Sequence, residues 1–168
     1  MKSASGYTLV ELLITVALLV VIAALMFPRI LRSRIAANEA AAISSIREIN
    51  QAETSYQVTY PTLGFAAKLA DLGGAKPCHP TPSSACLVNP QLATGEEDGY
   101  SFTALANSWS RNGIAIDYTA AAAPQIYNKS GVRVFCSMSD NVIRYLPNVE
   151  KSTRPPDTAH CRASIPME

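Results

Sequence analysis

The sequence has little of what most catalytic and cofactor sites require. It contains only two histidines, and its formal net charge is only +1. It has no G-x-S-x-G elbow, no H-E-x-x-H pair and no glycine-rich phosphate loop. A nearly neutral chain also provides no electrostatic basis for binding nucleic acid as its main partner. We therefore expect a protein that is not an enzyme and has no catalytic residues and no cofactor.

The few clusters of polar residues do not have the spacing of metal sites. His79 adjoins Cys78 and His160 adjoins Cys161, but no cysteine pair has the two- to four-residue spacing of structural zinc ligands. The acidic residues at 96–98 lack the spacing of a calcium-binding loop, so we interpret them as a solvated turn. The sequence predicts no metal site.

One long apolar run contains no charged residue at all. In the sixteen residues from Leu12 to Phe27, Thr15 is the single polar residue, and there is no glycine or proline. Residues 7–10 extend the run. A helix of about 20 mostly apolar residues spans the hydrocarbon core of a bilayer. The run therefore predicts a transmembrane segment.

Glu11 is the one residue that does not fit a lipid environment. A carboxylate there costs on the order of 2 to 3 kcal/mol, and ionisable residues that persist in membranes usually have a partner. A cut between Gly6 and Tyr7 would create an α-amino group four residues before Glu11. This pairing predicts that the chain is processed at that bond.

The N-terminal segment resembles the type IV pilins and type II secretion pseudopilins. The similarity rests on Lys2, Gly6, the sequence YTLVELL and an apolar run that closes at Pro28. Counted from Tyr7, Glu11 is the fifth residue and Pro28 the twenty-second, as in that family. The resemblance implies that a prepilin peptidase removes a leader after Gly6 and that Tyr7 is then N-methylated. It also implies that Tyr7, Glu11 and Pro28 act in subunit assembly.

Two residues depart from the pattern of the family. The first residue after the cut is Tyr7, where phenylalanine is more frequent, and Val20 stands where many pilins have a glycine that loosens the helix in the filament.

The remainder of the N-terminal half predicts an amphipathic continuation of the same helix. No glycine or proline occurs between Ile30 and Tyr60, so one helix can run from Tyr7 to about Gln57, with a bend at Pro28. Its apolar stripe consists of Ile35, Ala42, Ile43, Ile46, Ile49, Ala52 and Tyr56. We place the charged residues mostly off this stripe: Arg34, Glu39, Arg47, Glu48 and Glu53.

Arg29, Arg32 and Arg34 follow the apolar run directly, and two interpretations remain open. They are either solvated charges that face lipid phosphates, or partners of Glu39, Glu48 or Glu53 on a neighbouring subunit. By the positive-inside rule these arginines would hold the C-terminal body in the cytoplasm. The cysteines and the prepilin pattern indicate the opposite side, and we give them precedence.

The C-terminal part predicts a small α+β head. We expect a short helix at about 65–72, a proline-rich loop at 76–90, and two hairpins with strands at 100–105, 113–119, 132–136 and 141–146. The apolar stripe of the long helix is the available cover for this antiparallel sheet of three to four strands. The resemblance implies the same arrangement. The chain then divides into a leader at 1–6, a transmembrane or filament-core helix at 7–28, an amphipathic half at 29–60 and a head at 61–168.

Cys78, Cys86, Cys136 and Cys161 all follow the apolar run, which suits two disulfides in an oxidising compartment. Of the possible pairings we favour 78–86, which closes the proline-rich loop, and 136–161, which fixes the tail to a strand.

These observations favour a structural subunit of a type IV pilus. The expected partners are copies of the chain, inner-membrane lipid, the prepilin peptidase and the pilus assembly machinery. The chain would wait in the inner membrane with its head outside the cytoplasm and then enter an extracellular filament for adhesion or motility. The alternatives are a type II secretion pseudopilin, and an extracytoplasmic binding module or enzyme with an uncleaved anchor.

Overall fold

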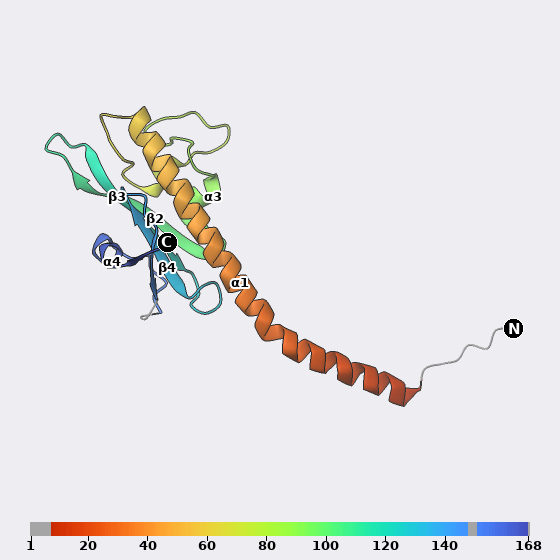
Figure 1. Cartoon of the computed structure of the whole chain (residues 1–168). Coiled ribbons are helices and arrows are strands. Elements are labelled where there is room, and N and C mark those ends of the chain that lie inside the picture. Colours follow the sequence, from red (N-terminus) through yellow and green to blue (C-terminus); the bar gives the residue numbers. More distant parts are fainter. Residues whose placement is uncertain (1–7, 148–150, 168) are drawn as a thin grey trace. The chain divides into compact units, whose positions relative to one another are not determined.

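The computed structural model describes residues 8–147 and 151–167 and divides the chain into two compact units, Met1–Arg34 and Ile35–Glu168. Gly6 and Tyr7 lie outside the described residues. Helix α1, Leu9–Thr59, belongs to both units, and the remaining elements belong to the second (Figure 1).

Helix α1 confirms the long helix expected from residue 7 to about residue 57. It contains 51 residues and continues through Pro28 without interruption. The bend expected at Pro28 stays a prediction. Among the described residues α1 is the one helix long and apolar enough to cross a membrane, judged by length and composition.

In the second unit, α1 buries one face, and this face contains two carboxylates as well as apolar side chains. Ile46 and Ile49 are fully buried, but Glu39 is only 5% exposed and Glu53 is 0% exposed. The prediction that these two glutamates lie off the apolar stripe is wrong. Both belong to a series of buried residues that recur every three or four positions along α1: 39, 42, 46, 49, 53 and 56.

The head contains an antiparallel sheet of six strands in the order β1-β2-β3-β4-β5-β6. The strands are β1 Glu96–Glu97, β2 Tyr100–Trp109, β3 Ala115–Pro124, β4 Arg133–Met138, β5 Arg144–Pro147 and β6 Ile165–Pro166. The expected fold class is therefore confirmed, but the expected count of three to four strands is too low. Strands β1 and β6 have two residues each and exist because a neighbouring strand pairs with them. Segments this short have no alternation that a sequence could display.

Strand β3 continues five residues beyond the expected end at Thr119. Its extension contains Ala120–Ala123, which are all 0% exposed, and it pairs with β2 as far as Tyr100↔Pro124. Alanine has low β propensity, so its run does not predict a strand. Here both faces of β3 are covered, and small side chains allow close packing from each side.

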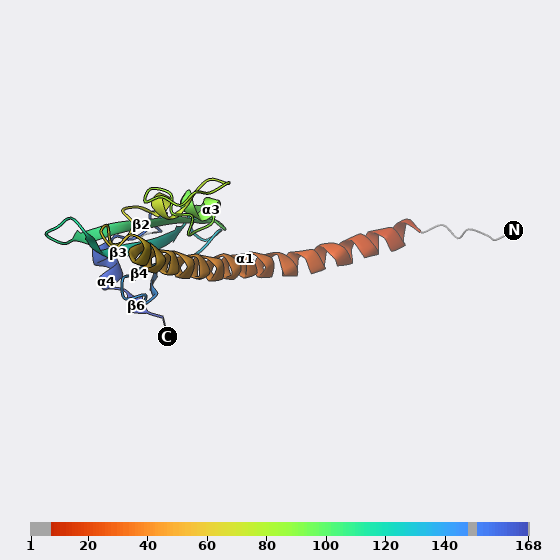
Figure 2. The same ribbon diagram turned by 90° about the horizontal axis from the view of Figure 1, so that it is seen from above.

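Helix α1 covers one face of the sheet, and the C-terminal tail, residues 151–167, covers part of the other face. Ala120, Ala122 and Phe135 belong to the main core with α1, whereas Ala121 and Cys136 pack with Cys161 in a smaller cluster. Neighbouring residues of a strand point to opposite faces, so these two clusters lie on the two sides of the sheet. Figure 2 shows the layer of β2, β3 and β4 beside the C-terminal part of α1.

The head also contains three short helices. Helix α2, Leu69–Leu72, is shorter than the helix expected at 65–72, because Gly64 and Lys68 form bridges with Ala115 and Leu105 of the sheet. Helix α3 spans Pro90–Ala93 and helix α4 spans Thr158–Arg162. Neither α3 nor α4 was predicted from the sequence.

The last hairpin differs from its expected bounds. We expected a strand from residue 141, but β5 begins at Arg144. Asn141 has a φ of 58°, and the Asp140 side chain accepts a hydrogen bond from the Val142 amide at 3.0 Å. These features follow the turn at residues 139–140 and delay the start of β5.

Candidate functional site

The N-terminal end of α1 is the segment for which the sequence predicts a function, and its local geometry follows from Thr8. The Thr8 Oγ1 accepts a hydrogen bond from the Glu11 amide at 3.3 Å. A threonine followed three residues later by a glutamate is the sequence of a capping box, and a carboxylate in the first turn opposes the helix dipole. Glu11 therefore suits the start of this helix even before any partner is considered. The sequence analysis missed this signal.

The predicted partner of Glu11 cannot be placed. Gly6 and Tyr7, the residues of the expected cleavage and methylation site, lie outside the described residues. The Glu11 side chain is exposed. Its pairing with the amino group of Tyr7 stays a prediction.

The surface of α1 that follows Glu11 is apolar and uncovered. Its large apolar side chains are 52–78% exposed: Leu9, Val10, Leu12, Leu13, Ile14, Val16, Leu18, Leu19, Val20, Val21, Ile22 and Met26. Exposure on this scale, on every side of a helix, marks a segment whose environment is lipid or other protein.

Glu39 fixes the start of β4 against α1. Its Oε1 accepts hydrogen bonds from the Val132 and Arg133 amides at 3.0 and 3.1 Å, and its Oε2 accepts from Nε and Nη2 of Arg133 at 2.9 and 2.6 Å. The Arg133 guanidinium also lies 5.6 Å from the centre of the Phe135 ring and 5.8 Å from that of Tyr145. Charge-assisted bonds of this kind are stronger than neutral ones, so the carboxylate is committed to its own head.

Glu53 binds the segment after α1 in a similar way but accepts fewer hydrogen bonds than Glu39. Its Oε2 accepts a hydrogen bond from the Ala66 amide at 2.8 Å, and Oε1 is buried with no hydrogen-bond partner among the described residues. Burial, together with repulsion from Asp71, raises the pKa of Glu53 to about 7, against the opposing effect of the Ala66 bond. This carboxyl group titrates near neutral pH in the interior of the head.

Glu48 and Glu97 meet at Asn89, the residue before α3. The backbone amide of Asn89 donates to Oε1 of Glu48 at 3.2 Å, and its side-chain amide donates to Oε1 of Glu97 at 3.1 Å. The Ser45 hydroxyl donates to Oε2 of Glu97 at 2.9 Å. Asn89 also caps α3 by accepting from the Leu92 amide at 2.7 Å. Glu97 is therefore a structural residue of β1, and our interpretation of residues 96–98 as a solvated turn is wrong for it.

These contacts bear on the three arginines that follow the apolar run. Glu39 and Glu53 are buried in their own head and cannot reach arginines of a neighbouring copy, and Glu48 is partly buried at Asn89. The interpretation that pairs these glutamates with Arg29, Arg32 and Arg34 across a subunit boundary is wrong for Glu39 and Glu53.

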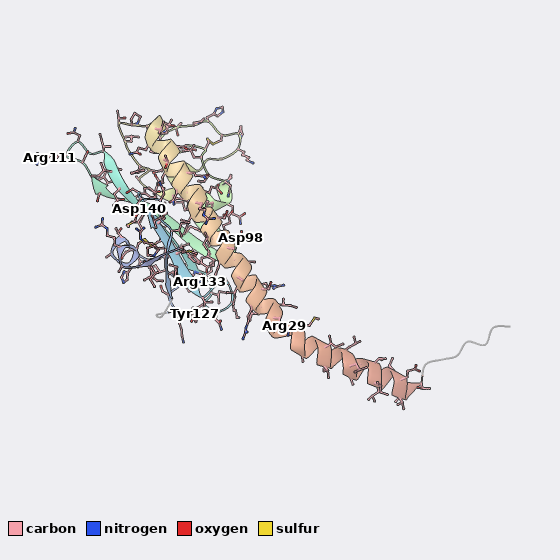
Figure 3. All side chains as sticks on the ribbon, in the orientation of Figure 1. Arg29, Asp98, Arg111, Tyr127, Arg133 and Asp140 are labelled. Atoms are coloured by element: carbon pink, nitrogen blue, oxygen red, sulfur yellow. A yellow bond between two sulfur atoms is a disulfide. The ribbon has the colours of Figure 1, made fainter. Side chains whose placement is uncertain are left out.

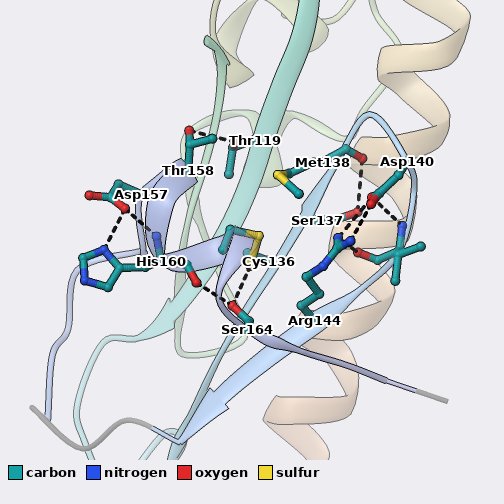
Figure 4. The surroundings of a disulfide bond; sticks show 12 residues. Thr119, Cys136, Ser137, Met138, Asp140, Arg144, Asp157, Thr158, His160 and Ser164 are labelled. Atoms are coloured by element: carbon teal, nitrogen blue, oxygen red, sulfur yellow. Dashed lines mark hydrogen bonds and ion pairs between the residues drawn. A yellow bond between two sulfur atoms is a disulfide. The ribbon is translucent and has the colours of Figure 1, made fainter. Parts of the chain in front are cut away.

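Two disulfides join Cys78 to Cys86 and Cys136 to Cys161, the pairing that the sequence favoured. The second disulfide attaches α4 to β4 (Figure 4). Asp157 begins α4 by accepting a hydrogen bond from the His160 amide at 2.9 Å, and its carboxylate lies 2.7 Å from Nδ1 of His160.

The tail has further polar contacts with the outer face of the sheet. The hydroxyl oxygens of Thr158 and Thr119 of β3 lie 3.0 Å apart (Figure 4). The side-chain amide of Asn107 of β2 also donates to the Thr119 hydroxyl at 2.6 Å. Within residues 8–147 and 151–167, no three His, Cys, Asp or Glu side chains come together as metal ligands would. Figure 3 labels Arg111, Arg133 and Asp140 on separate segments of the head.

Comparison with known proteins finds one match. Residues 1–27 match the family described as the prokaryotic N-terminal methylation motif. No curated protein and no solved structure matches the chain. The motif and the apolar helix fit anchoring in a membrane before assembly. The chain thus carries the prepilin signature of type IV pilins and pseudopilins at its N-terminus.

Proposed function

We propose that this protein is a structural, non-catalytic subunit of a type IV pilus. The observation that carries the proposal is the combination of the methylation motif at residues 1–27 with an apolar helix whose large side chains are exposed in the part of the chain that the structure describes. A prepilin peptidase cuts after Gly6, and the mature chain passes from the inner membrane into an extracellular filament that serves adhesion or motility.

In this proposal the apolar part of α1 exchanges lipid for the helices of neighbouring copies. Lipid tails are as apolar as leucine side chains, so the exchange itself yields little hydrophobic free energy. Helix packing and polar contacts must then determine the register of the subunits. Glu11 and the amino group of Tyr7 on an adjacent copy supply such a contact.

The charge pair would make the free energy of assembly depend strongly on Glu11. Removing one partner of a buried ion pair leaves an unpaired charge and costs about 3 to 5 kcal/mol. In Glu11→Ala the ammonium group of Tyr7 would be buried without a partner in each subunit contact. Filaments should fail to form, while insertion into the membrane, which depends on the apolar run, should persist.

The experiment compares Glu11→Ala with Glu96→Ala in cells that produce the full chain. Glu96 is exposed, so its loss removes the same charge without touching the helix. Electron microscopy of sheared surface material measures filaments, and fractionation measures membrane insertion. Abundant filaments in Glu11→Ala would refute the proposal, and loss of filaments in both variants would make the effect non-specific.

A pseudopilin has the same N-terminal chemistry, so the location of the polymer separates the two functions. Long filaments on the cell surface support the pilus subunit. A processed chain that stays in the cell envelope and affects protein secretion would instead support the pseudopilin.

A further inference from the structure

The three arginines after the apolar run form a compact basic segment with no acidic neighbour. Arg29, Arg32 and Arg34 are all exposed, and Arg29 is labelled on α1 in Figure 3. No Asp or Glu occurs from residue 12 to residue 38. Among the described residues none of the three forms an ion pair. The segment therefore has a local charge of +3, and the nearest acidic residues along the sequence are Glu11 and Glu39.

The position of the arginines along α1 matches the depth of lipid headgroups. Residues 9–28 span about 30 Å at 1.5 Å per residue, which is the thickness of the hydrocarbon core. Arg29 follows at once, and the three arginines extend over about 7.5 Å of helix axis. A helix that spans the bilayer with its apolar run places all three guanidinium groups in the headgroup layer on the side of the head.

The distribution of the arginines around α1 distinguishes a lipid surface from a protein partner. At about 100° per residue, Arg32 lies about 60° from Arg29 on one side, and Arg34 lies about 140° away on the other. One flat protein surface contacts one face of a helix and would reach two of these side chains at most. Headgroups surround a membrane-spanning helix, so they reach all three.

We propose that Arg29, Arg32 and Arg34 form an arginine collar that binds the phosphate groups of anionic phospholipids on the head side of the membrane. A guanidinium group binds phosphate through two parallel hydrogen bonds, which favours arginine over lysine at such a site. Lipid binding by the collar would also account for arginines on the head side of the membrane, where the positive-inside rule disfavours them. Basic residues on the side opposite the cytoplasm are disfavoured by the positive-inside rule, and anionic headgroups on that side stabilise them. The inference rests on the membrane-anchored stage of the proposed function.

The test measures lipid binding to the purified full chain in a non-ionic detergent. Phosphatidylglycerol and phosphatidylcholine with the same acyl chains are added in turn, and native mass spectrometry quantifies the lipid that remains bound to monomers. Each basic residue near an anionic surface contributes on the order of fivefold in affinity. The wild-type chain should prefer phosphatidylglycerol by at least tenfold on this basis.

Two matched triple variants locate the effect. Arg29→Gln with Arg32→Gln and Arg34→Gln should lose the preference. Lys76→Gln with Arg111→Gln and Lys129→Gln, which removes three exposed charges of the head, should keep it. Replacing the collar with three lysines retains charge and should give an intermediate preference, because lysine lacks the two parallel bonds.

Equal loss in both triple variants, or a wild-type chain with no preference, would overturn the inference. If the collar variant instead keeps lipid binding and loses association between copies, the partner is a carboxylate of a second copy, and the inference also fails. Filament formation is scored separately. A wild-type chain that forms filaments but shows no preference for anionic lipid refutes this inference alone, and a wild-type chain that shows the preference but forms no filaments refutes the proposed function alone.

Discussion

Glu53 should make the stability of the head depend on pH near neutrality. Burial raises the pKa of this carboxyl group from 4.5 to about 7 in the folded chain. The folded state therefore binds the proton more tightly than the unfolded state does. The stabilisation is fully present below about pH 4.5 and is lost as the pH rises through about 7. At about 1.4 kcal/mol per pKa unit, the loss amounts to about 3 kcal/mol.

The substitution Glu53→Gln removes the ionisation and keeps an oxygen that can accept the Ala66 amide. Urea unfolding of the full chain, with its disulfides intact and its apolar helix in a non-ionic detergent, measures the free energy of unfolding at pH 5 and at pH 8.5. The single tryptophan, Trp109, lies in β2 of the head and provides the fluorescence signal. Part of the stabilisation is already lost at pH 5, so the wild-type chain should lose about 2 to 3 kcal/mol more than the variant between these pH values.

A control and a clear refutation accompany this measurement. Glu96→Gln removes an exposed carboxylate and should leave the pH dependence of the wild-type chain unchanged. Asp71, whose pKa burial also raises, is present in all three proteins and titrates in each of them. Equal pH dependence in wild type and Glu53→Gln would show that the buried carboxyl group does not titrate near neutral pH, and the reasoning would be wrong.

Three further predictions concern the head and the leader. Glu39→Ala should lower the free energy of unfolding by about 3 kcal/mol, because it leaves two backbone amides and the partly exposed Arg133 without their acceptor. The same urea assay measures this loss, and a change below about 1 kcal/mol would contradict the importance of the Glu39 contacts. Replacing both Cys136 and Cys161 with alanine opens a loop of 25 residues and should lower the free energy of unfolding by about 3 kcal/mol. It should also release α4, which would appear as faster hydrogen exchange in residues 158–162, and unchanged exchange would refute this prediction. Gly6→Leu should block processing, and a mass spectrum with a mature chain starting at Tyr7 would disprove the expected cleavage rule.

Features that depend on contiguous residues could be predicted from the sequence. The absence of glycine and proline from residue 30 to residue 60 and the repeated isoleucines predicted α1, and the alternation of β2 and β4 predicted their strands. The N-terminal motif could be found for the same reason, since its residues all lie within one short segment.

Features that depend on distant partners could not be predicted with the same rules. A glutamate on a helix is ordinarily placed in solvent, but Glu39 is buried because Arg133, 94 residues away, supplies its donors. Glu53 is buried because the segment at Ala66 folds back against the helix. The regular steps 39, 42, 46, 49, 53 and 56 were the available signal, and they place both glutamates on the buried face.

The central claim is that the chain is cut after Gly6 and polymerises through its apolar helix. The most direct test is cryo-electron microscopy of filaments sheared from the cell surface, combined with the intact mass of their subunit. The account predicts filaments built from a chain that begins at an N-methylated Tyr7, with Glu11 next to the amino group of a neighbouring copy. A monomer that retains Met1 in the membrane, with no filament that contains it, would contradict the account.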